Sequence, residues 1–370
     1  MTTASDAEAE AGPDAGDGGD DATPAILSVG AAAIDEWYAV SNLPEPDGGA
    51  FAREVTSAFG GVGANVAVAL DRLGRDAGLV SRVGDDKYGR RALEYLAETG
   101  VDGTHVAVGD DTHTRSLILR DPDGERAIVT AGESFRGLRP TDAALDAMAD
   151  ADAVFLTAYA PDRAARRILD RVRSLRAAAA EAGESGADPP ALVFDLSGSV
   201  EELVGRGTEP PTIHRFLHEA DLFVADGVAA PAFFGSATAA VERVASAQEW
   251  ARGSGSRSRR GPTWPRAVLT HGADGMTAVA GGEVRRFDAF DVETVDATGA
   301  GDAFTAGLID RWIAADPAAS SADRDGVARG VRFAAAVAAI NCTARFTQPG
   351  LPTRDEVEAF LTDRGVDAGR

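Results

Sequence analysis

The stretch Val295–Ala314, VDATGAGDAFTAGLIDRWIA, joins a run of small residues to the start of an apolar helical pattern. Gly299, Ala300 and Gly301 stand directly before Asp302. Small residues let a bound group approach the backbone, and the unpaired N–H groups and dipole of a first helical turn attract anions. The stretch therefore predicts a phosphate site at the start of a helix.

The carboxylate of Asp302 gives this predicted site a second function. It would repel a bound phosphate unless a hydroxyl group or a metal lay between them. The combination suggests phosphoryl transfer, in which Asp302 accepts the proton of an attacking alcohol while the backbone holds the transferred phosphoryl. The alternative is that Asp302 is an ordinary acidic residue of a first helical turn and that the glycines only allow tight helix–strand packing.

A second glycine cluster lies in Phe59–Gly74, FGGVGANVAVALDRLG. Gly60, Gly61 and Gly63 precede Asn65 and a helix with one apolar face. Glycines allow close backbone approach, and the Asn65 amide can both donate to and accept from a polyol. A plain helix cap and a dinucleotide fingerprint are the alternatives. The fingerprint is disfavoured because the spacing lacks the G-x-G-x-x-G form and the segment does not follow the first apolar strand.

The rest of the chain alternates short apolar runs with helical patterns from Ala25 onward. This alternation predicts βαβ units, and hence an α/β fold in three α/β/α layers around a mostly parallel sheet. The predicted strands are Ile26–Ile34, Ala77–Val83, Ala153–Thr157, Ala191–Leu196, Asp221–Val224 and Ala267–Thr270.

Two segments interrupt the alternation, near residues 37–59 and 113–131. Both are typical of short amphipathic strands without intervening helices, and the second contains a DPDG turn. They predict a small β-sheet at the edge of the main domain, able to act as a lid. Residues 1–23 are nearly all small or acidic, so we expect a disordered acidic tail before a single domain over residues 24–370.

Composition narrows the classes of function. With 36 Lys and Arg against 59 Asp and Glu, the net charge is −23, which disfavours nucleic acid and anionic membrane surfaces as partners and suggests a halophilic protein. The single cysteine, Cys342, excludes an internal disulfide, and the acidic N-terminus does not resemble a signal peptide. The apolar runs are too short to span a bilayer. We therefore expect a cytoplasmic protein.

The two glycine segments together resemble the signature segments of the ribokinase-like, phosphofructokinase-B type carbohydrate kinase family. The resemblance covers nearly the whole chain after the tail and implies ATP with Mg²⁺, usually under a small β-sheet lid. It implies that Asp302 is the catalytic base and that Gly299, Ala300 and Gly301 form the anion hole. The residues that match substrate-hydroxyl positions are Asp35, Gly60, Gly61 and Asn65, and those that resemble the nucleotide-binding turn are Thr270, Gly272 and Gly275.

The chain departs from the family pattern in two places. Many members carry an Asn-x-x-Glu motif for the magnesium shell, where this chain has Asp226 for the Asn and Ala229 for the Glu. Asp296 and Thr298 match the first part of the family's monovalent-cation loop, which would hold K⁺, whereas Phe346 replaces a glycine in its second part.

The resemblance implies an ATP-dependent phosphotransferase that moves the γ-phosphate to a hydroxyl of a small sugar or sugar derivative. One alternative is a nucleoside kinase of the same fold. Another is a catalytically silent sugar- or nucleotide-binding regulatory homologue, which the residue Ala229 suggests. The lid strands would leave exposed edges, so we also expect a homodimer through the lid.

Overall fold

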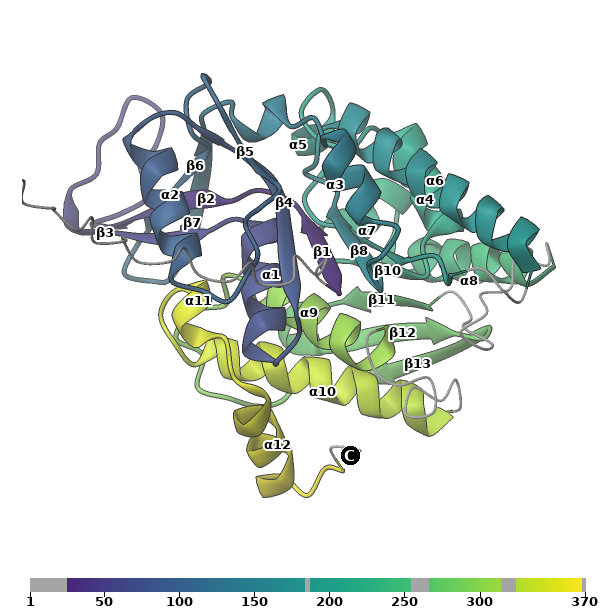
Figure 1. The fold of residues 1–370 in the computed structure, drawn as a ribbon. Helices are drawn as coiled ribbons and strands as arrows, with labels where there is room; N and C mark the ends of the chain where they lie inside the picture. Colours follow the sequence, from purple (N-terminus) through teal and green to yellow (C-terminus); the bar gives the residue numbers. More distant parts are fainter. Residues whose placement is uncertain (1–24, 184–186, 254–265, 314–323, 368–370) are drawn as a thin grey trace, which may run out of the picture.

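A nine-stranded sheet lies at the centre of the computed structural model, which describes residues 25–183, 187–253, 266–313 and 324–367 (Figure 1). The expected tail over residues 1–23 lies outside these ranges. Seven neighbouring strands are parallel, and β12 and β13 continue the sheet antiparallel. In spatial order the strands are β13 (Glu283–Phe287), β12 (Met276–Ala280), β11 (Arg266–Thr270), β10 (Leu222–Ala225), β9 (Ala191–Leu196), β8 (Ala153–Thr157), β1 (Ile26–Val29), β4 (Ala77–Gly84) and β5 (Val106–Gly109).

Helices cover both faces of this sheet, because its inner strands are apolar on both sides and bury a hydrophobic cluster on each. One cluster includes residues of α1 (Val62–Arg72), α2 (Lys87–Ala97), α9 (Ala300–Trp312), α10 (Arg324–Cys342) and α12 (Arg354–Asp363). The other includes residues of α3 (Asp142–Ala147), α4 (Asp162–Ala182), α5 (Val200–Leu203), α6 (Pro210–Glu219), α7 (Ala229–Phe234) and α8 (Ala237–Gly253). The predicted three-layer α/β/α arrangement is confirmed. None of the helices in the described ranges is long and apolar enough to cross a membrane.

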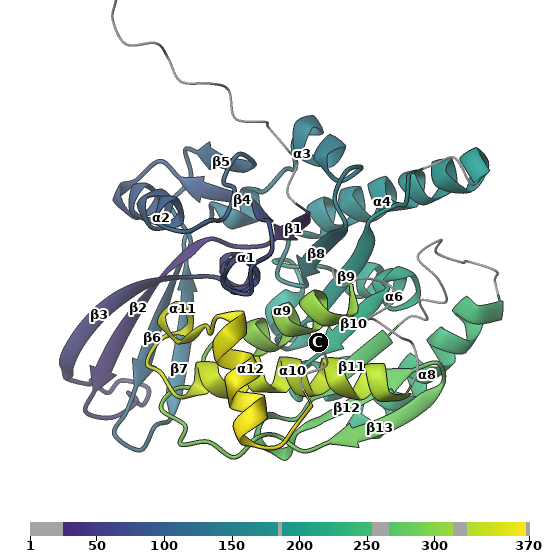
Figure 2. The same ribbon diagram turned by 60° about the horizontal axis from the view of Figure 1, so that its bottom comes forward.

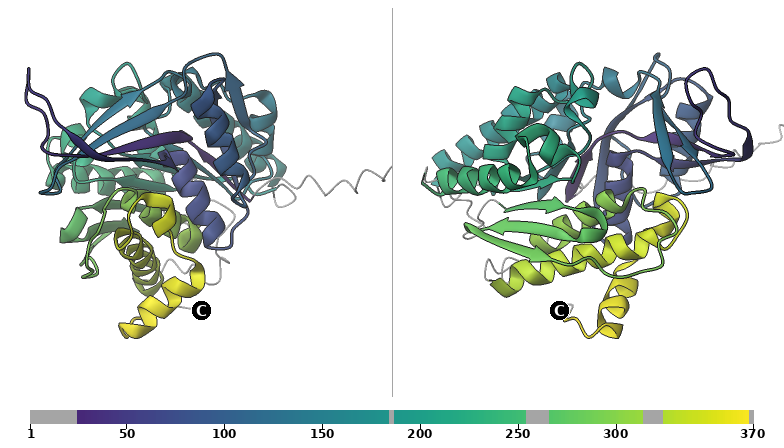
Figure 3. Two further views of the ribbon diagram at one scale, coloured as in Figure 1. Left: turned by 90° about the vertical axis from the view of Figure 1, so that its left-hand side faces the viewer. Right: turned by 180° about the vertical axis from the view of Figure 1, so that it is seen from behind.

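A second, four-stranded sheet projects from one end of the main domain (Figures 2 and 3). Its strands, in spatial order, are β3 (Ala52–Gly60), β2 (Ala33–Val40), β6 (Arg115–Arg120) and β7 (Arg126–Ala131). The outer pairs are antiparallel hairpin partners, whereas the central pair, β2 and β6, is parallel. We call this the small sheet; it contains strands from both segments that interrupt the sequence pattern.

The predicted first strand, Ile26–Ile34, is two strands in the structure. The chain leaves the large sheet after β1 and enters the small sheet as β2, which begins at Ala33. At the break, a Cβ on Gly30 would lie 2.5 Å from the Cα atom of Gly63, so this turn of backbone is packed directly against the start of α1. Asp35 therefore belongs to the small sheet rather than to the end of a core strand.

Candidate active site

The two glycine segments begin two helices that meet side by side. Asn65 lies in the first turn of α1 and Asp302 in the first turn of α9. The Asn65 Nδ2 group donates a hydrogen bond of 2.7 Å to Asp302 Oδ2. Two residues separated by 237 positions are thus brought into direct contact.

Glycine is required at the residue before each helix. Gly61 has a φ of 93° and Gly299 a φ of 79°, a region that favours glycine. A Cβ on Gly61 would lie 2.5 Å from the carbonyl oxygen of Ala31, and one on Gly299 would lie 2.0 Å from the Thr347 side chain. Both glycines therefore set the position of the helix start through the backbone.

The first turn of α9 presents an open backbone surface. A Cβ on Gly301 would meet no atom within 4 Å. Among the described residues, no backbone carbonyl accepts from the Gly301 or Asp302 amides, whereas the Ala300 amide already donates to Ala297 at 3.3 Å. Amides without acceptors at a helix N-terminus attract anions. Of the three expected anion-hole residues, Gly301 is the most exposed, and its amide has no backbone acceptor in the described ranges.

Desolvation raises the pKa of two carboxyls at this site, Asp302 and Asp35. Desolvation raises the pKa of Asp302 to about 8, and the charges of Asp195 and Asp35 add to the increase, while the Asn65 hydrogen bond opposes it. Burial likewise raises the pKa of Asp35 to about 6, against the hydrogen bond from Ser116. Perturbed carboxyls in one place are typical of functional sites.

Asp35 and Gly60 are neighbours on paired strands of the small sheet. Only a glycine fits at position 60, because a Cβ there would lie 2.1 Å from Asp35 Oδ2. The pKa of Asp302 responds to the charge of Asp35, which places this carboxyl near the helix start. Of the expected substrate-binding residues, Asn65 contacts Asp302, Asp35 is close enough for the two charges to interact, and Gly60 packs against Asp35.

The expected nucleotide-side residues form a separate group at the carboxyl ends of β10 and β11. Thr270 ends β11, Gly272 begins the short helix Gly272–Asp274, and Gly275 follows it with a φ of 89°. A Cβ on Gly227 would lie 3.2 Å from the Thr270 carbonyl oxygen, so the loop after β10 adjoins this turn. Within the described ranges, no recorded hydrogen bond or ion pair joins this turn to Asp302.

The Asp226 carboxylate accepts hydrogen bonds from backbone amides at the start of α7. Its Oδ1 accepts from the amides of Val228 at 2.8 Å and Ala229 at 2.5 Å. Ala229 is buried, so no carboxylate occupies the position of the family's Glu. Asp195, at the carboxyl end of β9, has a pKa raised to about 7, mainly by burial and further by the charge of Asp226, while a hydrogen bond from Ser197 opposes the shift.

The loop expected to bind a monovalent cation has protein partners for its polar groups. The Asp296 carboxylate accepts from the amides of Thr298 at 3.0 Å and Phe346 at 3.2 Å. Phe346 has a φ of 69°, which explains why a glycine is expected there, and its ring contacts Trp37 of β2 edge to face. The Thr298 hydroxyl accepts from Arg126 Nη1 at 2.6 Å, so a positive charge lies beside this loop.

Three residues at this site were missed by the sequence reasoning. Gln348 donates through Nε2 to Asn65 Oδ1 at 3.3 Å, which orients the Asn65 amide toward Asp302. Asp195 could have been found as an acidic residue ending an apolar strand, because ligands bind at the carboxyl ends of parallel strands. Arg126 gives no such signal, since its position depends on the register of the small sheet.

This chain is similar in sequence to known carbohydrate kinases. The family model for the pfkB family carbohydrate kinases matches residues 23–191 and 218–354. The "ATP-dependent ribose-1-phosphate kinase" of Halopiger xanaduensis is 31% identical over 341 residues, which cover 92% of this chain and 98% of that protein. The "2-dehydro-3-deoxygalactonokinase" of Haloferax volcanii is 30% identical over 86% of this chain and 91% of that protein.

Solved structures share the fold at lower identity. The ribokinase from Giardia lamblia superposes with a TM-score of 0.76 at 22% identity, covering 92% of this chain and 99% of that one. The Arabidopsis thaliana ribokinase complexed with ribose and ATP gives a TM-score of 0.68 at 21% identity, with the same coverage. The family model spans most of the chain and both signature segments meet at Asp302, so this chain belongs to the pfkB family of carbohydrate kinases.

Proposed function

We propose that the protein transfers the γ-phosphoryl group of ATP to a hydroxyl of a small sugar or sugar derivative. The contact between Asn65 and Asp302 carries the proposal, because it places a hydrogen-bonding amide and a carboxyl beside a helix N-terminus that can hold a phosphoryl group. The names of the family relatives point to the same reaction class.

Each group at the site has a separate role in this reaction. Asn65 and Asp35 hold the sugar so that one hydroxyl faces Asp302. The Asp302 carboxylate orients that hydroxyl and accepts its proton as the bond to phosphorus forms. The first-turn amides at Gly301 and Asp302 stabilise the negative charge on the transferred phosphoryl. A loose transition state releases the proton late, so a carboxylate is basic enough for this role.

Mg²⁺ is part of the proposal and would neutralise charge on the β- and γ-phosphates of ATP. Asp195 and Asp226 fit a role around it, because the charge of Asp226 raises the pKa of Asp195 and a divalent cation held through water would relieve that repulsion. No cluster of three metal-ligating side chains is found in the described residues, so ATP supplies most of the ligands. Undiminished turnover in excess EDTA would contradict this part of the proposal.

The test of the proposed function is ADP release from ATP with a panel of acceptors. Ribose, fructose, 2-keto-3-deoxygluconate and nucleosides represent unphosphorylated acceptors, and ribose 1-phosphate and fructose 1-phosphate represent phosphorylated ones. Turnover above the ATPase background with a sugar supports the proposal. Turnover with nucleosides alone would favour the nucleoside kinase. Saturable ligand binding without any ADP release would favour the silent regulatory homologue.

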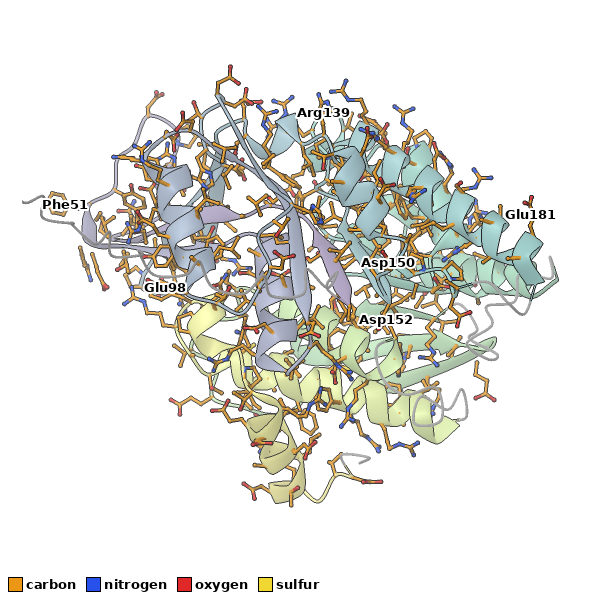
Figure 4. All side chains as sticks on the ribbon, in the orientation of Figure 1. Phe51, Glu98, Arg139, Asp150, Asp152 and Glu181 are labelled. Atoms are coloured by element: carbon orange, nitrogen blue, oxygen red, sulfur yellow. The ribbon has the colours of Figure 1, made fainter. Side chains whose placement is uncertain are left out.

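A homodimer through the small sheet also belongs to the proposal. Strand alternation places five apolar residues on the outer face of this sheet, Tyr38, Val55, Leu117, Leu119 and Val129. Val55 is 57% exposed and Val129 is 55% exposed, and Phe51 points away from the domain at the outer end of the sheet (Figure 4). Such a patch is typical of an interaction surface. A monomer by light scattering at working concentration would contradict the dimer.

The loop expected to bind K⁺ lies beside the positive charge of Arg126. Asp296 retains lone pairs for a cation, but Arg126 holds the Thr298 hydroxyl and its charge would repel one. We therefore expect only a small difference in turnover between KCl and tetramethylammonium chloride at equal ionic strength. A cytoplasmic location and the lack of nucleic-acid and membrane partners remain predictions from composition.

A further inference from the structure

The inner face of the small sheet is the face that carries Asp35, and its residues follow from the strand register. Asp35 is paired with Ser116, and two residues further along β2 Trp37 is paired with Ile118. Two residues beyond these, Arg120 of β6 pairs with Arg126 of β7. Because alternate residues share a face, both arginines lie on the same face as Asp35.

This face of the small sheet is in contact with the loop that precedes α9. Arg120 Nη2 donates to the Val295 carbonyl at 3.1 Å, and Arg126 Nη1 donates to the Thr298 hydroxyl at 2.6 Å. Thr298 is the residue directly before Gly299, where the anion-hole segment starts. The small sheet therefore places the two guanidinium groups next to the predicted phosphate site, although its strands are far in sequence from the loop before α9.

The turn between Arg120 and Arg126 contains three carboxylates, Asp121, Asp123 and Glu125. Among the described residues neither arginine forms an ion pair, although the chain has 59 acidic residues against 36 basic ones. Like charges opposite each other on paired strands are destabilising. Each guanidinium has five N–H donors, and one recorded hydrogen bond leaves most of them available. Two adjacent unpaired arginines are typical of a phosphate-binding site.

We propose that Arg120 and Arg126 bind a phosphate group at the mouth of the anion hole. This proposal rests on the proposed function. It adds two positively charged side chains of the small sheet to the residues that bind phosphate. The position beside Thr298 favours the γ-phosphoryl of ATP as the bound group. A phosphate carried by the sugar substrate has the same chemistry, and the experiment separates the two sources.

The experiment measures binding of AMP-PNP and of AMP by calorimetry, in full-length wild type, Arg126→Gln and Arg120→Gln at one fixed salt concentration. Loss of a charged hydrogen-bond donor should weaken AMP-PNP binding about tenfold or more and leave AMP binding unchanged. Arg126→Lys should recover part of the loss, because it keeps the charge without the planar fork. Arg53→Gln is the matched control. Arg53 is an exposed residue at the register shift of β3, and its replacement removes the same charge from the same sheet.

The remaining outcomes decide between the sources and the alternatives. In a second outcome, the variants bind AMP-PNP as wild type does, but their KM rises about tenfold for a phosphorylated sugar and not for its unphosphorylated counterpart. This result would assign the bound phosphate to the sugar substrate and would still support phosphate binding by Arg120 and Arg126. Equal weakening of AMP and AMP-PNP would show that the arginines only hold the sheet in place, which overturns the proposal. Wild-type behaviour of both variants would also overturn it. If wild type itself binds no AMP-PNP and releases no ADP, the proposed function fails instead.

Discussion

Arg75 and Asp310 connect the C-terminal ends of the same two helices that bring Asn65 and Asp302 together at their N-terminal ends. Arg75 Nε lies 2.6 Å from Asp310 Oδ1, and Asp310 is fully buried. Arg354, at the start of α12, reaches the same oxygen at 2.5 Å. The helices α1 and α9 are thus joined at both ends, so the distance between Asn65 and Asp302 is fixed by packing and by a buried charge.

This ion pair predicts a large effect on stability. Asp310→Asn removes the shared counter-charge of Arg75 and Arg354, and removal of one partner of a buried pair costs about 3 kcal/mol. Urea unfolding at pH 7 measures the loss. Asp363→Asn, an exposed change at the end of α12, is the control and should stay within about 0.5 kcal/mol of wild type. Equal stability of the two variants would show that the buried pair does not contribute.

The pKa of Asp302 predicts the pH dependence of the reaction. Its pKa is raised to about 8, so the carboxyl is mostly protonated at pH 7 and cannot then accept a proton from the sugar. We expect kcat/KM to rise about tenfold per pH unit below pH 8 and to level off above it. A profile that is flat between pH 6 and pH 9 in a constant-ionic-strength buffer would contradict the role of Asp302 as base.

The same pKa predicts a pH-dependent gain of stability in a variant. A carboxyl whose folded pKa lies above its unfolded value stabilises the fold fully only below the unfolded pKa of about 4, and this contribution is lost as the pH rises through about 8. Asp302→Asn has no charge to bury. It should therefore be more stable than wild type at pH 9, by about 1–3 kcal/mol, with a smaller difference at pH 5. Parallel stability curves of the two proteins across this range would count against a raised pKa.

Much of the fold could be predicted because the sequence patterns reflect local physics. The apolar strands, such as β8 and β9, are continuous apolar runs because both of their faces are covered by helices. The glycines before Asn65 and Asp302 could be read as helix starts because only glycine tolerates the backbone found at Gly61 and Gly299. The prediction of one continuous strand over Ile26–Ile34 was wrong, because the apolar pattern continues where the chain passes from the large sheet to the small sheet.

The parts of the site that were missed depend on long-range packing. Gln348 and Asn65 are 283 positions apart in the sequence, although their side chains are hydrogen-bonded. The segment around Gln348 shows no helical or strand periodicity that would have drawn attention to it. Arg126 reaches Thr298 only because the register of β6 and β7 places it on the inner face. A shift of one residue in that register would turn the side chain outward, and sequence spacing alone does not determine it.

The net charge of −23 predicts a requirement for salt. Carboxylates that repel one another destabilise the compact state, and salt at molar concentration reduces the screening length to about 3 Å. We expect the thermal midpoint and the turnover to rise together as KCl is increased from about 0.1 M to about 3 M. Full cooperative stability in dilute buffer would contradict this expectation. Sucrose at matched water activity is the control for effects other than charge screening.

The most direct test of the site compares two variants of the contact between Asn65 and Asp302. Asp302→Asn keeps the shape of the side chain but removes the base, so kcat should fall about 10²- to 10⁴-fold. AMP-PNP should still bind, because the amides of the first turn of α9 do not depend on the carboxylate. Asn65→Ala should instead raise the KM for the sugar, because a polyol contact is lost while the phosphoryl site stays assembled.

An ordinary acidic residue at a helix start would behave differently. Its replacement by Asn would change stability by about 0.3–1 kcal/mol and leave turnover near wild type. Gln348→Ala provides a graded comparison, because Gln348 donates to Asn65 and forms no hydrogen bond with Asp302 among the described residues. It should shift the KM less than Asn65→Ala does. If Asp302→Asn kept most of its turnover on the best acceptor while Asn65→Ala lost it, the base would have to be sought between the buried carboxyls Asp35 and Asp195, whose pKa values are also raised.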